Sequence, residues 1–290
     1  MTVLELIEAS ASQFADAGVA FGHGTTNAFD EAAWLVLWRL GLPLDDLDGV
    51  AETAVSPQQR DTVRELVGER IRSRKPAAYL TREAWLQGVP FYVDERAIVP
   101  RSLIAELLVD GNIDPWLGEQ TRRVLDLCTG NGSLAVLAAM TYPEVAVDAA
   151  DISSDALAVA RINVEKHGFQ DRVRLLRSDG LGSVSRPYDL ILCNPPYVSE
   201  QSMAELPAEY QAEPRMALAG GADGMDFIRA LLQDAPSHMS AQAVLVLEIG
   251  NERSNFEAAF PRLEVVWLET SAGEDQVLLV IRESLLSLRA

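Results

Sequence analysis

The sequence predicts an α/β protein in which a mainly parallel sheet, with helices on both faces, follows a small helical domain. From Arg123 onward, short apolar segments bounded by turn residues alternate with segments of helical periodicity, the order expected of a parallel sheet. The first eighty residues show only helical spacing. The length of 290 residues also favours two domains, because single hydrophobic cores rarely grow past about 250 to 300 residues.

Three segments of the helical part repeat apolar residues at intervals of three and four. They are Val3, Leu4, Leu6 and Ile7; Trp34, Leu35, Leu37 and Trp38; and Val63, Leu66, Val67 and Ile71. Pro43 and Pro57 lie between the segments, and proline interrupts a helix. We expect Trp34 and Trp38, four residues apart on one helical face, in the core, where large aromatic rings dominate burial. Residues 1–75 are therefore predicted to form a helical domain.

Residues 76–100 change to short extended pieces, which predict a hairpin-like connector between the domains. The pieces are Ala84–Leu86 and Pro90–Val93. The connector ends at Pro100, ahead of an apolar helix that contains Leu103 and Leu107. Residues 101–290 then form the predicted α/β domain.

The α/β domain alternates predicted strands and helices. The strands are Arg123–Cys128, Val145–Asp151, Val173–Leu176, Tyr188–Cys193, Ala243–Ile249, Val265–Leu268 and Val277–Ile281, and the helices are Leu134–Met140, Asp155–His167, about Met225–Ala235 and a segment after Asn251. Strands this apolar are typical of a sheet buried on both faces. Ligands of such sheets bind beyond the carboxyl ends of the strands, so the residues that end strands are the candidates for a site.

Composition limits the function classes. No apolar run reaches the roughly 18 residues of a membrane span, and Glu5, Glu8 and Asp16 stand where a basic leader would lie. These features predict a soluble cytoplasmic protein without a membrane partner. Two cysteines and three scattered histidines offer neither a disulfide framework nor a zinc-like cluster, so we expect no metal site. Cys128 and Cys193 end apolar strands and are expected as small core residues.

The net charge of −19 favours a basic protein as partner. Lys and Arg neutralise the phosphate backbone in most nucleic-acid complexes. Here only Lys75 and Lys166 are lysines among 24 basic residues, and the arginines are scattered among 43 acidic residues. Without a basic stripe, a nucleic-acid partner is disfavoured.

A glycine-rich loop follows the first strand of the sheet, in Asp126-Leu127-Cys128-Thr129-Gly130-Asn131-Gly132-Ser133. Gly130 and Gly132 remove side chains that would keep a ligand from the backbone. Asp151 closes the second strand, where related folds place a carboxylate that binds ribose hydroxyls. Asp179 follows the third strand and is placed for an adenine edge. The loop alone leaves NAD, S-adenosylmethionine and a ligand-free turn open.

Asn194-Pro195-Pro196-Tyr197 ends the fourth strand and points to the chemistry. The two prolines fix the backbone and remove N–H donors, which leaves carbonyl oxygens as acceptors. A planar amide nitrogen becomes a better nucleophile toward a methyl sulfonium when acceptors hold both of its hydrogens, here the Asn194 side-chain oxygen and the Pro195 carbonyl. Tyr197 is expected to pack its ring against the flat acceptor. The tetrapeptide therefore favours methyl transfer from S-adenosylmethionine.

Four further stretches accompany this tetrapeptide. They are Lys75-Pro76-Ala77-Ala78-Tyr79-Leu80-Thr81; Phe91-Tyr92-Val93-Asp94-Glu95-Arg96 with Val99-Pro100-Arg101-Ser102; Leu206-Pro207-Ala208-Glu209-Tyr210 with Glu213-Pro214; and Gly221-Ala222-Asp223-Gly224. With them the chain resembles the protein-(glutamine-N5) methyltransferases, whose fold is the Rossmann-like sheet of class I S-adenosylmethionine-dependent methyltransferases. It is most similar to the branch that modifies a large-subunit ribosomal protein of the L3 type, because the release-factor branch usually has glycine where Cys128 stands.

The resemblance implies roles for individual residues and for the helical domain, which would recognise the protein substrate. Contacts to S-adenosylmethionine are implied at Asp126, Cys128, Thr129, Gly130, Gly132, Asp151, Ile152, Asp179 and Asn194; contacts to glutamine at Asn194, Pro195, Pro196, Tyr197 and Arg101; and catalysis at Asn194, Pro195 and Tyr197. The family commonly has Ser or Thr where Asn131 stands. Arg101 and Glu106 either border the pocket or form a surface ion pair.

Three alternatives stay open beside this prediction. A release-factor glutamine methyltransferase and an amino-group methyltransferase of nucleic acid would both present a planar NH₂ to the same acceptors. A noncatalytic assembly factor would bind S-adenosylmethionine alone. Binding alone does not need Asn194 and Tyr197, so their presence counts against the third alternative.

Overall fold

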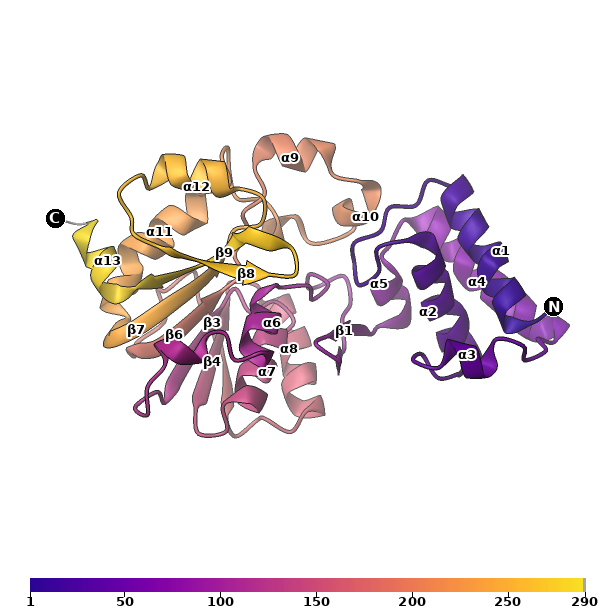
Figure 1. The fold of residues 1–290 in the computed structure, drawn as a ribbon, viewed down its shortest axis with the longest axis horizontal. Coiled ribbons are helices and arrows are strands. Elements are labelled where there is room, and N and C mark those ends of the chain that lie inside the picture. Colours follow the sequence, from indigo (N-terminus) through magenta and orange to yellow (C-terminus); the bar gives the residue numbers. More distant parts are fainter. Residues whose placement is uncertain (289–290) are drawn as a thin grey trace.

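A helical domain lies beside a larger α/β domain in the computed structural model, which describes residues 1–288 (Figure 1). The helices of the first domain are α1 (Val3–Asp16), α2 (Ala28–Leu40), α3 (Leu47–Val50), α4 (Pro57–Ser73) and α5 (Ala77–Thr81). Capping boxes begin two of them: Thr2 exchanges hydrogen bonds with Glu5 at α1, and Ser56 does so with Gln59 at α4. Each satisfies backbone groups that a helix start leaves unpaired.

The helical domain has its own apolar core, as the periodicity predicts. Its buried members are Val3, Leu6, Ile7, Phe14, Val19, Ala32, Leu35, Val36, Leu37, Val63, Val67 and Ala77. The expectation for the two tryptophans is only partly met, because Trp34 and Trp38 are half-buried. Trp34 packs at the edge of this core, against the connector. The domain boundaries at residues 75 and 100 remain predictions.

The connector contains the predicted hairpin. Strands β1 (Ala84–Leu86) and β2 (Val89–Phe91) pair antiparallel, with Ala84 opposite Phe91. Gln87 and Gly88 turn the chain with φ of +50° and +72°, the left-handed conformation that tight hairpin turns require. The hairpin lies between the two domains in Figure 1.

The α/β domain is built on a seven-stranded sheet in the order β5-β4-β3-β6-β7-β9-β8. The strands are β3 (Arg123–Leu127), β4 (Ala146–Asp151), β5 (Val173–Arg177), β6 (Tyr188–Cys193), β7 (Met239–Glu248), β8 (Val266–Thr270) and β9 (Gly273–Ile281). The first five in this order run parallel, and β9 and β8 are antiparallel additions at one edge. The predicted mainly parallel sheet is confirmed.

Helices cover both faces of the sheet (Figure 1). They are α6 (Ile104–Val109), α7 (Ser133–Thr141), α8 (Ser154–Lys166), α11 (Asp226–Asp234), α12 (Arg253–Ala259) and α13 (Arg282–Ser287). The short helices α9 (Glu200–Glu205) and α10 (Ala208–Gln211) lie away from the sheet, α10 toward the helical domain, and short 3-10 turns occur at Asp114–Trp116, Arg215–Ala217 and Ala235–Ser237. Residues of each strand alternate between two cores: Val124 packs with α6 and α7, and Leu125 packs with α11, α12 and α13. This alternation follows from the period of two in a strand.

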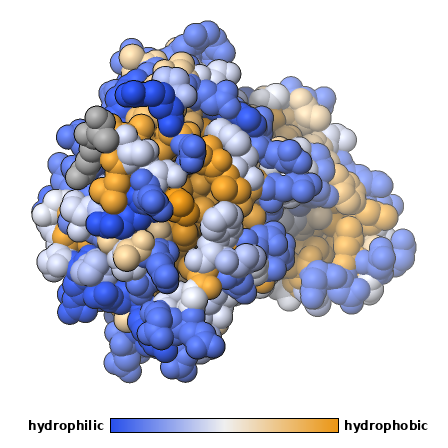
Figure 2. All heavy atoms as spheres, turned by 60° about the vertical axis from the view of Figure 1, so that its left-hand side comes forward, coloured by the Kyte–Doolittle hydropathy of each residue, from blue (hydrophilic) through white to orange (hydrophobic). Residues whose placement is uncertain are grey.

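The strand order places a ligand crevice at the ends of β3 and β6. After β3 the chain adds β4 and β5 on one side, and it then returns to add β6 on the other side. The carboxyl ends of β3 and β6 flank this reversal, which is where open parallel sheets bind ligands. Figure 2 shows apolar residues at the surface both across the α/β domain and on the helical domain behind it, each area bordered by hydrophilic residues. No helix in residues 1–288 combines the length and apolarity needed to cross a bilayer.

Candidate active site

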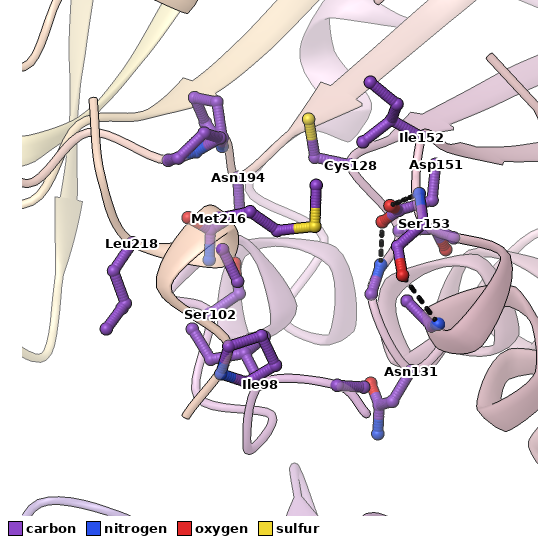
Figure 3. A pocket seen from close by; sticks show the side chains of 18 of the residues that line it. Ile98, Ser102, Cys128, Asn131, Asp151, Ile152, Ser153, Asn194, Met216 and Leu218 are labelled. Atoms are coloured by element: carbon purple, nitrogen blue, oxygen red, sulfur yellow. Dashed lines mark hydrogen bonds between the residues drawn. The ribbon is translucent and has the colours of Figure 1, made fainter. Parts of the chain in front are cut away.

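A cavity of about 480 Å³ opens at this crevice and collects most of the predicted site residues. Those that line it are Cys128, Thr129 and Gly130 after β3, Asp151 and Ile152 at the end of β4, Asp179 after β5, Asn194, Pro195, Pro196 and Tyr197 after β6, and Arg101 before α6. Figure 3 shows Asn194 and Asp151 on opposite sides of the cavity, with Cys128 and Met216 between them.

The sequence predicts cofactor contacts at Asp126 and Gly132, but neither residue lines the cavity. The buried Asp126 carboxylate accepts hydrogen bonds from Thr129 Oγ1 at 2.5 Å and from the Ala135 N–H at 3.0 Å. Burial raises the pKa of Asp126 to about 7. A Cβ at Gly132 would lie 3.0 Å from the Cβ of Ala160, so α8 packs closely only against glycine. Both residues therefore shape the loop whose edge lines the cavity.

The two cysteines differ in their surroundings. Cys193 is buried, as expected, whereas Cys128 is half-buried and lines the cavity. Cys128 has a φ of +62°, a left-handed conformation that turns the chain sharply out of β3. This turn brings Thr129 and Gly130 to the cavity wall. The apolar periodicity of the strand predicted a core cysteine because periodicity does not reveal such a turn.

Asp151 at the end of β4 combines a fixed position with free acceptor capacity. Its Oδ2 accepts a hydrogen bond from the Gly130 N–H at 2.9 Å, and its Oδ1 accepts one from the Ser153 N–H at 2.9 Å (Figure 3). Burial raises the pKa of Asp151 in spite of these bonds. Since a carboxylate offers about four acceptor sites, two remain for a ligand. The exposed side chain of Ile152 lies next to it on the cavity wall, so a hydroxyl pair beside an apolar base fits this place.

Asn194 presents an unengaged amide to the cavity. It follows the last residue of β6 and is half-buried, and its side chain makes no hydrogen bond to any residue in 1–288. Pro195 and Pro196 follow it on the same wall and contribute carbonyl oxygens without N–H donors. The end of β6 therefore offers acceptors for the hydrogens of a planar NH₂ group.

A buried carboxyl group, which the sequence pattern did not indicate, accepts a hydrogen bond from Tyr197. The Tyr197 hydroxyl donates to Glu248 Oε1 at 3.5 Å. Glu248, at the end of β7, accepts hydrogen bonds from Ser102 Oγ at 2.5 Å and from the Leu103 N–H at 3.0 Å. Burial raises the pKa of Glu248 to about 7, against the lowering effect of these bonds. Glu248 thus joins Tyr197 to the start of α6.

Three glycines let the chain close around Tyr197. A Cβ at Gly250 would lie 2.4 Å from the Tyr197 ring, and a Cβ at Gly220 or Gly224 would lie 2.8 Å or 2.2 Å from Tyr197 backbone atoms. Contacts this short exclude any larger residue unless the chain shifts. The ring of Tyr197 is therefore fixed by its surroundings as well as by Glu248.

Arg101 lines the cavity and pairs with Glu213, 112 residues away, instead of Glu106. Its guanidinium donates to both Glu213 oxygens at 2.7 Å, while Glu106 accepts hydrogen bonds from the backbone and hydroxyl of Ser271. Burial would raise the pKa of Glu213, but hydrogen bonds from His23 and Arg101 outweigh it and lower that pKa to about 2. Arg101 therefore borders the cavity, which was one of the two predicted roles, whereas Glu106 does not line it.

The missed residues carried weak signals in the sequence. Glu248 stands two residues before Gly250 at the end of an apolar strand, a place where ligand sites of this fold occur. Glu213 lies in a segment without strand or helix periodicity, and only the fold brings it to Arg101. Within residues 1–288 there is no group of three His, Cys, Asp or Glu side chains that could hold a metal ion.

Sequence comparisons relate nearly the whole chain to named proteins. The family model described as Methyltransferase small domain matches residues 105–216. A protein of Bordetella pertussis is 53% identical over 98% of this chain and 96% of its own length. A protein of Neisseria meningitidis serogroup B is 46% identical over 98% of this chain and 94% of its own length. Both carry the name ribosomal protein uL3 glutamine methyltransferase.

Structural comparison supports the fold. The crystal structure of the hMettl16 catalytic domain in complex with the MAT2A 3'UTR hairpin 6 superposes with a TM-score of 0.52, covering 77% of this chain and 81% of that one. Sequence identity in this superposition is 13%, so the likeness concerns the arrangement of the sheet and its helices alone.

Proposed function

Because the chain belongs to the family of ribosomal protein uL3 glutamine methyltransferases, we propose that it methylates the side-chain amide nitrogen, N5, of a glutamine in the large-subunit ribosomal protein uL3. The observation that carries this proposal is the unengaged Asn194 amide, next to the Pro195 carbonyl, on the wall of a cavity of about 480 Å³. S-adenosylmethionine is the methyl donor, and it supplies an electrophilic methyl group when bound.

The residues of the cavity suit this donor. Asp151 would hold the ribose hydroxyls with its two remaining acceptor sites, and Ile152 would cover the base. Asp179 is exposed on the same wall and would meet the edge of the adenine. Cys128, Thr129 and Gly130 would border the donor along the loop after β3.

The residues at the end of β6 would activate the glutamine. The nitrogen lone pair of an amide is delocalised into its carbonyl, so the nitrogen attacks poorly unless its hydrogens are held by acceptors. The Asn194 side-chain oxygen would accept one hydrogen and the Pro195 carbonyl the other. Both bonds strengthen as the nitrogen becomes positive, which stabilises the transition state more than the ground state. The nitrogen gains a bond to the methyl carbon as the bond between that carbon and the donor sulfur breaks, with the electron pair of the broken bond staying on sulfur, and the nitrogen then loses one proton to water.

Tyr197 and Arg101 would position the acceptor. The ring of Tyr197 would lie against the flat amide, and Glu248 and the surrounding glycines keep that ring in place. Arg101 stays on the cavity wall because Glu213 holds its guanidinium. No charged base is required before the attack, since the proton leaves only after the nitrogen has become positive.

The site of action follows from the substrate. We assign the enzyme to the cytoplasm, where ribosomal proteins are made, and the helical domain of residues 1–75 to recognition of a basic substrate. The acidic net charge of −19 supports this partner. The release-factor alternative loses its support, because relatives that are 45–53% identical are named for uL3.

A methylation assay with separate acceptors tests this function. The enzyme is incubated with labelled S-adenosylmethionine and, in parallel, with purified uL3, a peptide-chain release factor or DNA. We expect label on uL3 alone, and with an Asn194→Ala enzyme we expect that label to accumulate roughly 10²- to 10³-fold more slowly. Label on the release factor or on DNA, with none on uL3, would overturn the proposal.

A further inference from the structure

A second cavity of about 620 Å³, here called the anchor groove, lies between the helical domain and the hairpin. Its walls come from the α1–α2 loop, α2, the α2–α3 loop, the start of α3 and β1. The lining includes His23, Phe29, Asp30, Leu44, Asp45 and Trp85. None of them takes part in the proposed chemistry.

Several large apolar side chains of the anchor groove are exposed to solvent and not packed in a core. The exposed fractions are 39% for Phe29, 36% for Leu44 and 46% for Trp85. These three come from separate segments of the chain and converge on one cavity. Such clusters on soluble proteins usually mark an interaction site, and apolar pockets of this kind receive a single anchoring side chain.

One pair of rings separates the anchor groove from the active-site cavity. The imidazole of His23 lines the groove and packs on the ring of Tyr210, with 4.3 Å between the ring centroids. Tyr210 in turn lines the active-site cavity. The anchor groove and the active-site cavity therefore share this pair of rings as a common wall, which suits a polypeptide that occupies both.

Buried ion pairs fix the spacing between the two cavities. Glu213 lies between Arg101, which donates to it at 2.7 Å, and His23, whose Nε2 is 3.4 Å away. Arg70 of α4 is fully buried and pairs with Glu31 at 2.7 Å and with Glu209 at 3.3 Å. These contacts connect the helical domain to the segment that carries Tyr210. Burial of charged pairs contributes little net stability. The main effect of these ion pairs is therefore to hold the helical domain and the segment with Tyr210 in one relative position.

The charge of the anchor groove indicates which residues surround the anchor. Asp30 and Asp45 are the acidic side chains of its lining, and both are exposed. Complementary charge steers partners and disfavours wrong ones. We propose that the anchor groove binds a large apolar side chain, flanked by Lys or Arg, of the same substrate molecule whose glutamine enters the active-site cavity. This inference rests on the proposed function and adds how the protein substrate is selected.

Kinetics on two substrates test the anchor groove. The variant Phe29→Ser/Leu44→Ser removes two exposed walls and is compared with Leu286→Ser, which removes an equally exposed apolar side chain of α13, 39% exposed. Substrates are full-length uL3 and a short peptide around its methylated glutamine that lacks the anchor. For uL3 we expect KM to rise roughly tenfold or more in the groove variant, with kcat unchanged. Methylation of the short peptide should not change, and Leu286→Ser should behave as wild type.

Salt and charge give a second readout. Asp45→Asn should raise KM for uL3 at low ionic strength and lose this effect at high salt, because exposed charges are screened. Asp110→Asn, an exposed acidic change outside the groove, should leave KM unchanged. An unchanged KM for uL3 in the groove variant would overturn the inference. So would an equal loss on protein and peptide, or a wild-type dimer in solution that the groove variant dissociates. Absence of uL3 methylation by the wild-type enzyme would instead reject the proposed function.

Discussion

Replacing Asn194 by alanine isolates the proposed acceptor, because this side chain has no partner among residues 1–288. The amide lines the cavity and makes no hydrogen bond to residues 1–288, so its removal leaves no buried group unsatisfied. We expect the free energy of unfolding to change by less than about 0.5 kcal/mol. Loss of one preorganised transition-state hydrogen bond costs about 2.7–4 kcal/mol, so kcat should fall by roughly 10² to 10³.

Single-turnover methylation of uL3 at saturating S-adenosylmethionine measures this loss. Urea unfolding and calorimetric binding of the donor, run on the same preparation, separate a chemical defect from misfolding. Asn251→Ala is the matched control, because Asn251 lines the same cavity from the segment after β7. A kcat of Asn194→Ala within threefold of wild type, or an equal loss in Asn251→Ala, would refute the assignment of Asn194.

The remaining predictions concern the donor, the packing and the pH dependence. Asp151→Ala should weaken S-adenosylmethionine binding by roughly 10- to 100-fold, the value of charge-assisted hydrogen bonds; unchanged affinity by calorimetry would place the ribose elsewhere. Gly250→Ala should lose about 1–3 kcal/mol of stability through contact with the Tyr197 ring and should also have lower activity. Gly168→Ala is the control, because the space around a Cβ at Gly168 is open, and it should lose less stability in urea unfolding. Glu248 has a pKa raised from 4.5 to about 7, so the folded state binds more protons between these values and this group's contribution to stability is lost as pH rises through about 7. Glu248→Gln should therefore gain stability relative to wild type from pH 5 to pH 8, and a pH-independent difference in urea unfolding would contradict this pKa.

Much of the fold could be predicted because buried parallel strands have a strong sequence signature. Apolar runs such as Tyr188–Cys193 end abruptly at turn residues, and the structure has a strand over the same residues. The chemistry was also local: Asn194 and Asp151 end strands, and parallel topology brings strand ends to one edge. The antiparallel arrangement of β8 and β9 depends on pairing between distant segments, which periodicity does not encode.

The rest of the site depends on distant contacts and on side-chain direction. Glu213 reaches Arg101 across 112 residues, and Glu248 reaches Ser102 across 146 residues. Asp126 looked like a cofactor ligand from its position, yet its side chain points inward and is fully buried. A strand pattern gives the alternation of faces but not which face meets a ligand.

The most direct test is to locate the methyl group on uL3 after reaction with isotope-labelled S-adenosylmethionine. Tandem mass spectrometry of the digested protein assigns the label to one residue, and NMR of the labelled methyl identifies the atom that carries it. We predict a single methyl group on the side-chain amide nitrogen of one glutamine. A label on lysine, arginine, the amino terminus or the main chain would contradict the selection of a planar NH₂ by the acceptors at the end of β6.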